Sequence, residues 1–387
     1  MAPESALVAE ATKKFALDLQ HWLRNDDSLA TENLFYSPAS LLIALGMTSY
    51  GAKGKTAEEI MKFLHLTSVP AAHLKDNMEQ FLSALNAASD NSNKLLTANK
   101  LFIEKSVEIL ESFKEGNPEF YDAEVGLVDY EEHTEKAREE INQWVEQNTN
   151  DKITGLIPPG MLSADTRLTL VNAIYFKGSW LVQFRKEETA LASFYVSASE
   201  KRQVLMMHRE AEFKYLESKG LACQVLEMPY IGFKMSMVVF LPEETDGLAS
   251  LEEKMTFDNL EESLSLLDAS RPHEREVYFP KFKLTQQFDL TDILSKMGVQ
   301  EMFIRGKADF SGIAAEPLHV SHMVHKAFVE VSDNEEGTKA AATGRSDVVD
   351  SKFFGSTFNA NHPFLFLIRH IDTGAILFLG RLIKPNI

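Results

Sequence analysis

The 387-residue sequence has a single cysteine and no long apolar run. Cys223 has no partner for an internal disulfide, which excludes a disulfide-stabilised secreted scaffold and a metal site built from several cysteines. The longest apolar runs, such as Phe364–Ile368, are far shorter than the roughly 20 residues of a membrane-spanning helix. The N-terminus lacks a signal-peptide pattern, and no Asn-x-Ser/Thr sequon occurs. These absences predict a cytoplasmic protein without a membrane segment, and they leave open a release that uses no signal peptide.

Positive charge is scarce as well. The chain has 39 Lys and Arg against 57 Asp and Glu, so its formal net charge is −18 at pH 7. Because the field of such a chain repels phosphate groups, we expect neither nucleic acid nor an anionic membrane surface as a partner. Hydrophobic residues make up 44% of the chain, which is enough for a substantial buried core.

The motifs of common catalytic sites are also missing. The sequence has no G-x-S-x-G, H-E-x-x-H or G-x-G-x-x-G pattern, so we predict a protein that is not an enzyme and binds no cofactor. His319, His322 and His325 have metal-like spacing. On a strand, however, His322 would point away from the other two, which argues against a shared metal ion and favours a buried, hydrogen-bonded His325. Cys223 lies among apolar residues, and we interpret it as a buried structural thiol.

The order of the periodic patterns predicts an α+β fold with mostly antiparallel sheets. Thr56 and Glu59 resemble the capping box of one short helix. No linker or repeat marks a boundary, so residues 1–387 are predicted to form one domain. Helices are expected around residues 15–23, 38–45, 56–65, 74–85, 132–149, 248–267 and 290–297. Strands are expected at residues 168–176, 233–241, 277–282, 318–331, 364–369 and 375–382.

The segment Glu335–Phe358 is unusual because it is rich in small and polar residues yet lies between two predicted strands. A surface loop has no physical reason for small or apolar residues to alternate with charged ones. Here every second residue from Thr338 to Val348 is small or apolar, and the charged residues of that stretch occupy the other positions. Period two is typical of a strand. The composition therefore permits this segment to enter a sheet without burying a charge.

Several separate motifs, in the same order along nearly the whole chain, resemble those of the serpin family. The most specific is Glu335-Glu336-Gly337-Thr338-Lys339-Ala340-Ala341-Ala342-Thr343, which is similar to the proximal hinge of the family's bait loop. The other matching motifs are the stretches Asn33–Ser40, Gly51–Ala57, Asn99–Phe102, Asn172–Trp180 and His362–Phe366. The single cysteine, the absent signal peptide and the absent sequons resemble the intracellular, ovalbumin-like (clade B-like) branch.

The resemblance implies a fold of three β-sheets surrounded by eight or nine helices, with a reactive-centre loop at about residues 335–358. It also implies the activity of a metastable suicide substrate. A protease forms an acyl-enzyme at the bait, the cleaved loop enters the main sheet as a new strand, and the protease is trapped. The expected partner is thus a target protease, and the inhibitor itself is expected to be a monomer.

The same resemblance implies roles for individual residues. The shutter is the hydrogen-bonded group under the point where the sheet opens, and it maps to Ser37, Ser40, Asn172 and His325. The breach, where insertion starts, maps to Trp180. Core packing is the simpler interpretation of these residues, and both hold if a buried polar network determines when the sheet opens. The hinge maps to Glu335, Gly337, Thr338, Ala340, Ala341, Ala342 and Thr343.

Counting from the hinge glycine places the cleaved bond at Ser351-Lys352, with an uncertainty of about one residue. Cleavage after Asp350 would suit a caspase, and cleavage after Lys352 a trypsin-like serine protease. Phe353 would suit a chymotrypsin-like enzyme, and the small Ser351 resembles members that trap papain-like cysteine proteases. We expect a serine protease, with the cysteine proteases as alternatives.

A non-inhibitory serpin that acts as a chaperone, carrier or storage protein is the competing hypothesis. Thr338 and the alanines that follow argue against it, because such members often have charged or bulky hinge residues. Heparin is not an expected ligand. The region that resembles the family's glycosaminoglycan-binding helix, residues 74–85, contains Lys75 as its single base, which is too little charge for a polyanion.

Overall fold

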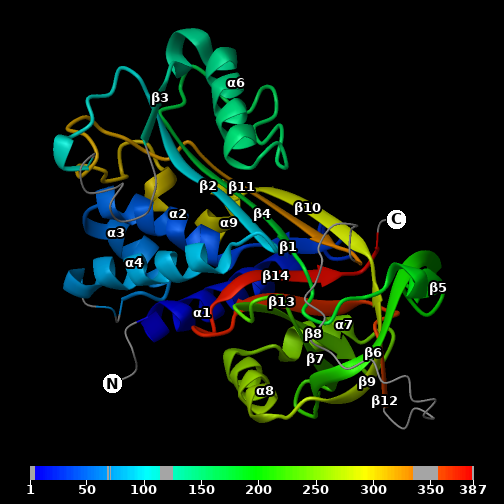
Figure 1. Cartoon of the computed structure of the whole chain (residues 1–387). Coiled ribbons are helices and arrows are strands. Elements are labelled where there is room, and N and C mark those ends of the chain that lie inside the picture. Colours follow the sequence, from blue (N-terminus) through cyan, green and yellow to red (C-terminus); the bar gives the residue numbers. More distant parts are fainter. Residues whose placement is uncertain (1–4, 68, 70, 114–124, 334–355, 386–387) are drawn as a thin grey trace.

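The computed structural model describes residues 5–67, 69, 71–113, 125–333 and 356–385. The predicted hinge and all candidates for the cleaved bond lie outside these residues. In the described part there are eight α-helices (Figure 1): α1 (Ser5–Arg24), α2 (Pro38–Gly51), α3 (Gly54–Phe63), α4 (Ala71–Ala88), α6 (Tyr130–Asn148), α7 (Leu248–Lys254), α8 (Phe257–Ala269) and α9 (Thr291–Lys296).

The strands form two hydrogen-bonded assemblies. A five-stranded sheet contains, in spatial order, β10 (Phe282–Asp289), β11 (His322–Val331), β4 (Leu168–Gly178), β2 (Asn93–Glu104) and β3 (Val125–Val128). A nine-stranded assembly contains β1 (Leu34–Tyr36), β14 (Ile376–Leu382), β13 (Phe364–His370), β8 (Met235–Pro242), β7 (Cys223–Pro229), β6 (Lys201–Ser218), β9 (His273–Pro280) and β12 (Ser356–Asn359), with β5 (Ala190–Tyr195) paired to β6.

The long strand β6 belongs to two sheets of the larger assembly. Its first part pairs with β5 and β9, and its last residues, 214–218, pair with β7. The expected three sheets are therefore present as the five-stranded sheet and two sheets that share β6. Two short 3-10 turns, Lys186–Glu188 and Glu301–Phe303, complete the described elements.

Two neighbouring strands in the five-stranded sheet are parallel. β11 pairs with β4 from His322 opposite Thr169 to Glu330 opposite Lys177, and we call this boundary the β4/β11 seam. On their other sides, β11 pairs antiparallel with β10, and β4 pairs antiparallel with β2. The seam is therefore flanked by antiparallel neighbours, and it runs through the middle of the sheet (Figure 1).

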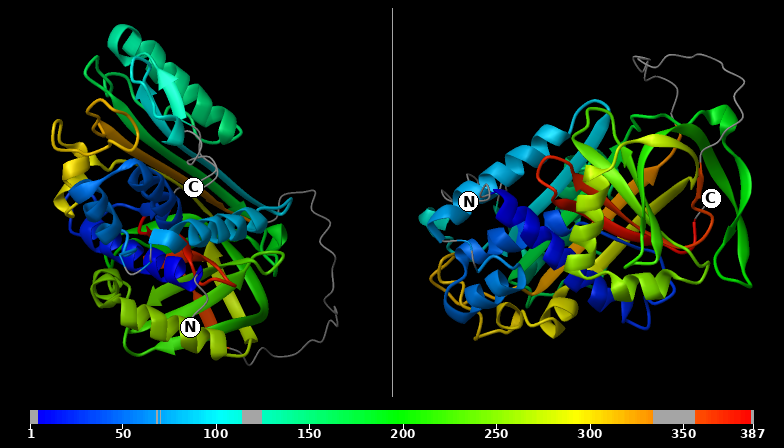
Figure 2. Two further views of the ribbon diagram at one scale, coloured as in Figure 1. Left: turned by 90° about the vertical axis from the view of Figure 1, so that its left-hand side faces the viewer. Right: turned by 90° about the horizontal axis from the view of Figure 1, so that it is seen from below.

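Burial on both faces explains why the central strands are continuous apolar runs in the sequence. Every residue of β8, β13 and β14 is buried, because both faces of these strands are covered. Helix α2 is buried on nearly all sides and packs against β2, β4 and β14. Helix α6 lies on the opposite side of the five-stranded sheet from α2 (Figures 1 and 2).

Some predicted boundaries were wrong. The run at residues 277–282 is not one strand, because the chain leaves β9 after Pro280 and starts β10 at Phe282 in the other sheet. The helical pattern at 248–267 is two helices, α7 and α8, separated at Met255 and Thr256. The expectation of no strand before residue 168 was also wrong, because β2 occupies residues 93–104. Its irregular burial pattern has no clean period of two, which concealed it.

The predicted capping box at Thr56 was also wrong. Helix α3 starts at Gly54, so Thr56 lies inside its first turn, and the N-cap residue Lys53 makes no side-chain cap. The Thr56 hydroxyl instead accepts a hydrogen bond from the Asp309 N–H at 3.0 Å. Glu59 accepts the N–H groups of Gln300 and Glu301, both at 2.8 Å, and its carboxylate therefore joins α3 to a distant segment instead of capping its own helix.

Candidate functional site

Ser37 positions the start of α2 beneath the five-stranded sheet. Its backbone is extended (φ −114°, ψ 101°), and its Oγ accepts the N–H of Ser40 at 3.1 Å. Pro38 follows at the first helical position, where a missing N–H costs nothing. The same Oγ donates to the Leu377 carbonyl at 2.6 Å, so Ser37 also ties α2 to β14.

Three polar residues form a row across three neighbouring strands of the sheet. Asn172 of β4 is in register with His325 of β11 on one side and with Asn99 of β2 on the other. The Asn172 amide nitrogen donates to the carbonyl of Ser40 at 3.0 Å, to its Oγ at 2.7 Å, and to Asn99 Oδ1. Asn172 Oδ1 is hydrogen-bonded to His325 Nδ1. Since β4 and β11 meet at the seam, this last bond crosses it.

The hydrogen bonds around His325 define its tautomer. The backbone N–H of Ser37 donates to Nε2 at 3.2 Å, so Nε2 is an acceptor and Nδ1 carries the proton that Asn172 accepts. His325 is completely buried, and burial lowers its pKa to about 3. The ring is therefore neutral near pH 7 and fully bonded in that state.

We call Ser37, Ser40, Asn99, Asn172 and His325 the buried polar cluster. The structure brings together the four residues predicted for the shutter and adds Asn99, which the sequence analysis placed in a family motif without giving it a role. Asn99 is partly buried in a mixed stretch of β2 that also contains Thr97 and Lys100, so its residue type alone did not point to a hydrogen-bonding partner. The register that supplies that partner, opposite Asn172, is not visible in the sequence.

Trp180 lies just beyond the end of β4, away from this cluster along the chain. Its ring stacks on Tyr230 with 4.5 Å between centroids, and the two residues form an isolated β-bridge. Its Nε1–H donates to the carbonyl of Ser332 at 3.2 Å. Ser332 directly follows β11, so Trp180 joins the ends of the two seam strands.

Asp333 follows Ser332 at the end of the seam, and two side chains that the sequence analysis did not identify hold its carboxylate. Its carboxylate is 2.7 Å from Lys281 Nζ and accepts the Thr189 hydroxyl at 2.9 Å. Asp333 is only 6% exposed, while Lys281 is partly exposed. We call Trp180, Lys281, Thr189 and Asp333 the latch. It fixes the last described residue before the segment that contains the predicted hinge.

The C-terminal boundary of the predicted bait loop, Phe358, was placed too far along the chain, because it lies inside a strand. The residues Ser356–Asn359 form β12, which pairs in parallel with β9, and Phe358 is completely buried. An exposed loop up to Phe358 was therefore wrong, because an apolar side chain at this position is needed to cover the inner face of the sheet. The predicted bait loop therefore ends before Ser356.

The three histidines do not share a strand as predicted. His319 precedes β11, which begins at His322, so the parity argument against a metal ion does not extend to His319. A different reason replaces it, because His325 uses both ring nitrogens in hydrogen bonds. His322 instead lies 3.5 Å from a carboxylate oxygen of Asp289.

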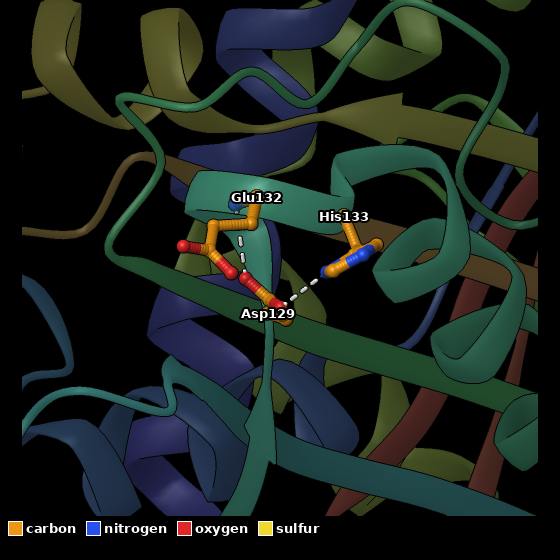
Figure 3. Close-up of side chains that lie close together, drawn as sticks. All are labelled: Asp129, Glu132 and His133. Atoms are coloured by element: carbon orange, nitrogen blue, oxygen red, sulfur yellow. Dashed lines mark hydrogen bonds and ion pairs between the residues drawn. The ribbon is translucent and has the colours of Figure 1, made fainter.

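Another polar group, Asp129, Glu132 and His133 at the start of α6, has its ligand-type atoms close together (Figure 3). Asp129 caps the helix by accepting the Glu132 N–H at 3.0 Å. Lys105 Nζ is 2.6 Å from Asp129, and this ammonium, with His133, holds the pKa of Asp129 well below its usual value. A cationic partner is thus already supplied, and capping accounts for the group.

Cys223 is buried in β7, and burial raises its pKa to about 12, which agrees with a structural thiol. Among the described helices, none combines the length and the apolar character needed to cross a bilayer.

Comparison with known proteins identifies the family. Residues 10–385 match the sequence model described as "Serpin (serine protease inhibitor)". The chain is 40% identical to Serpin B6 of Pongo abelii, with 98% of this chain and 100% of that protein covered. It is 38% identical to the leukocyte elastase inhibitor of Equus caballus, with coverage of 98% and 99%. These descriptions name inhibitors, in agreement with the prediction that the protein is not an enzyme.

The fold leads to the same result. The crystal structure of uncleaved ovalbumin superposes with a TM-score of 0.88 at 30% identity, covering 98% of this chain and 100% of that chain. The structure of a tumour suppressing serpin gives a TM-score of 0.85 at 28% identity, with the same coverage. The α+β architecture expected from the sequence is therefore confirmed, and the chain belongs to the serpin family.

Proposed function

We propose that the protein is a suicide-substrate inhibitor that traps a protease as a covalent acyl-enzyme. The observation that carries the proposal is the β4/β11 seam. A strand that runs antiparallel to both seam strands can enter between them, and the chain that leaves β11 at Asp333 leads directly into the segment whose composition alternates with period two. Entry replaces one parallel pairing with two antiparallel ones, which are slightly more stable per residue.

The displacement of the protease and the free energy of loop insertion are both large enough for trapping. From Gly337 to Ser351 is 14 residue steps, so at ~3.3 Å per residue an attached protease would be carried roughly 46 Å. A dozen inserted residues, at about 1 kcal/mol net for each backbone hydrogen bond, would contribute on the order of 10 kcal/mol. Such a free energy is enough to distort a catalytic triad, whose activity depends on close positioning. Trapping succeeds when insertion is faster than deacylation.

The buried polar cluster and the latch fit the roles of shutter and breach in this mechanism. The Asn172–His325 hydrogen bond crosses the seam and must break before a new strand can pass. The latch joins the ends of the seam strands beside the start of the bait, where Trp180 holds the Ser332 carbonyl. Since a neutral, fully bonded network is costly to disrupt in the interior, these groups would keep the sheet closed until the bait is cut.

The proposed bait bond is Ser351-Lys352, with cleavage after Asp350, Lys352 or Phe353 as alternatives. A serine protease is the proposed target because the family description names that class and one relative is called an elastase inhibitor. The proposed cysteine-protease alternatives are a papain-like enzyme and a caspase. We further propose that the chain acts as a monomeric, single-domain protein inside cells, where the buried free thiol of Cys223 stays reduced.

A decisive experiment incubates the full chain with a panel of serine and cysteine proteases. Trapping predicts an SDS-resistant complex and a released C-terminal fragment whose first residue identifies the cleaved bond. Cleavage without a complex from every protease would reject inhibition. The alternative, a non-inhibitory carrier, chaperone or storage serpin, predicts that outcome together with a cleaved form that melts at the same temperature as the intact chain.

A further inference from the structure

The outer face of the β4/β11 seam carries a charged pair at the end where the chain leaves β11. Glu330 is in register with Lys177 of β4, and this is the last register pair of the seam. Residues alternate between the two faces of a strand, so Glu330 lies on the face opposite to the buried His325. Lys177 Nζ is 3.7 Å from Glu330 Oε1. This ion pair therefore crosses the seam on the other side from the buried polar cluster.

A second lysine contacts the same carboxylate oxygen. Lys283 of β10 is in register with Glu330 from the other side, and its Nζ is 3.1 Å from the same Oε1. The Glu330 side chain is only 13% exposed, whereas that of Lys283 is 63% exposed. A mostly covered carboxylate thus lies between two ammonium groups, and the three residues come from three consecutive strands of the sheet, β10, β11 and β4.

Opening of the seam affects the two contacts differently. When a strand enters, β4 and β11 move from one interstrand spacing, ~4.8 Å, to two, ~9.6 Å. The contact between Lys177 and Glu330 is lost, because facing side chains meet across a single spacing. Lys283 keeps its contact, since β10 pairs with β11 on the side that does not open. The attraction between Lys177 and Glu330 therefore favours the closed seam specifically.

The two lysines also act on each other. Their ammonium groups carry the same charge and approach one oxygen, so they repel each other while the seam is closed. Opening moves Lys177 away and relieves this repulsion. Lys283 consequently lowers the net gain from the Lys177 contact, and it does so from an exposed position beside the seam.

This inference rests on the proposed function, because it concerns what keeps the seam closed until a strand enters. We propose that Lys177, Glu330 and Lys283 form a charge clasp that regulates seam opening, and that the two lysines have opposite effects. Lys177 and Glu330 are positioning residues that hold β4 against β11, and Lys283 weakens that hold. The buried polar cluster is neutral, whereas the clasp is charged and its lysines are partly exposed, so dissolved salt screens the clasp.

The test measures hydrogen exchange of the backbone amides in β4 and β11 by mass spectrometry. Exchange reports local opening of the intact chain and needs no protease. The variants are Lys177→Met, Glu330→Gln and Lys283→Met, each of which removes one charge of the clasp. Lys177→Arg keeps the charge and serves as the conservative variant. Lys136→Met is the matched control, because Lys136 is an exposed lysine that pairs with Glu140 inside α6.

We expect Lys177→Met and Glu330→Gln to exchange the seam amides about threefold faster than the unmodified chain at low salt, the effect typical of one cross-strand charge pair. Lys177→Arg should match the unmodified chain. Lys283→Met should exchange about twofold more slowly, because Glu330 then bonds to Lys177 without a competitor. At ~1 M salt, where the screening length is ~3 Å, the unmodified chain should approach the rate of Lys177→Met. The amides of β8 and β13 should exchange at unchanged rates in every variant.

Faster exchange in Lys283→Met, to the same degree as in Lys177→Met, would overturn the proposal, because the two lysines would then not act in opposite directions. A parallel change in β8 and β13 would also overturn it, since the cause would be a general destabilisation of the chain. An equal change in Lys136→Met would have the same meaning. The proposed inhibition is judged separately, by the SDS-resistant complex. The expected exchange pattern without any complex would reject inhibition and support the clasp, and complex formation with unchanged exchange in Lys177→Met would reject the clasp.

Discussion

Asn172 and His325 face each other across the β4/β11 seam, and their side chains are joined by the hydrogen bond between Asn172 Oδ1 and His325 Nδ1. Both residues are completely buried. The amide nitrogen of Asn172 bonds at the same time to Ser40 beneath the sheet. Opening of the seam therefore requires one neutral network to break as a unit, and the predictions below address that network and its neighbours.

Replacing Asn172 with alanine should lower the stability of the intact chain. The Nδ1–H of His325 would lose its partner in the interior, and the Ser40 hydroxyl would keep only its donation to Asn99 at 3.3 Å, at a cost of about 1–3 kcal/mol for each unsatisfied group. We expect the free energy of unfolding, measured in urea, to fall by about 3 kcal/mol. Asn148→Ala is the control, because Asn148 is exposed and bonds to the end of its own helix. Equal effects of the two substitutions would contradict the role of the cluster.

The stability of the intact chain should decrease on mild acidification because of His325. Its folded pKa of about 3 lies below the ordinary histidine pKa of 6.5, so the unfolded chain binds the proton first. Stability is then complete above pH 6.5 and is lost as the pH falls from there toward the folded value. Between pH 7.5 and 5.5 we expect a loss of about 1 kcal/mol.

The measurement compares urea unfolding at the two pH values in the unmodified chain and in His325→Gln. Glutamine can donate and accept a hydrogen bond but does not titrate, so the variant should lack this part of the pH dependence. Other buried histidines, His362 and His370, also have lowered pKa values and contribute equally to both proteins. An unchanged pH dependence in His325→Gln would refute the assignment.

The sequence was informative where short-range chemistry determines the structure. Pro38 at the head of an apolar run predicted the start of α2, and the apolar runs of the late strands predicted β8, β13 and β14. The family motifs then identified the cluster residues. Each of these features depends on neighbours within a few positions, which is the distance over which capping and periodicity operate.

The sequence was uninformative about contacts that depend on the pairing of strands far apart in the chain. Asn99 received no role because its partner Asn172 is 73 residues away, and Asp333 received none because Lys281 and Thr189 come from distant segments. The opposed glutamates of β6 and β9 were missed for the same reason. Glu210 and Glu276 oppose each other only through the pairing of β6 with β9, which no local pattern reveals.

Trp180→Phe should loosen the end of the seam without disturbing the stacking. Phenylalanine keeps an aromatic ring on Tyr230 but cannot donate to the Ser332 carbonyl, a loss of about 1 kcal/mol. We expect a synthetic peptide with the sequence of residues 338–350 to enter the sheet faster in this variant, as followed by native gel electrophoresis. Phe184→Leu, a change in a ring that contacts Trp180 but makes no such bond, is the control. Equal peptide uptake in Trp180→Phe and the unmodified chain would argue against a latch.

Lys281→Met should destabilise the same region through Asp333. The carboxylate is almost completely buried and would retain only the Thr189 hydroxyl as a partner. Because Lys281 is partly exposed, the expected loss is about 1–2 kcal/mol, less than for a fully buried pair. The double variant with Asp333→Asn should recover part of this loss, since the uncompensated charge is removed. Additive losses in the double variant would show that the two residues are not coupled.

Thr338→Arg should convert the inhibitor into a substrate. If the cleaved segment enters the seam with the alternation seen in its sequence, position 338 faces the core, and a buried arginine without a partner costs several kcal/mol. Insertion would then be slower than deacylation, so the protease would escape and the yield of SDS-resistant complex would fall by at least tenfold. Lys339→Arg is the matched control, because position 339 has the opposite parity and tolerates a charge. A yield of complex from Thr338→Arg as high as that from Lys339→Arg would contradict strand insertion with position 338 facing the core.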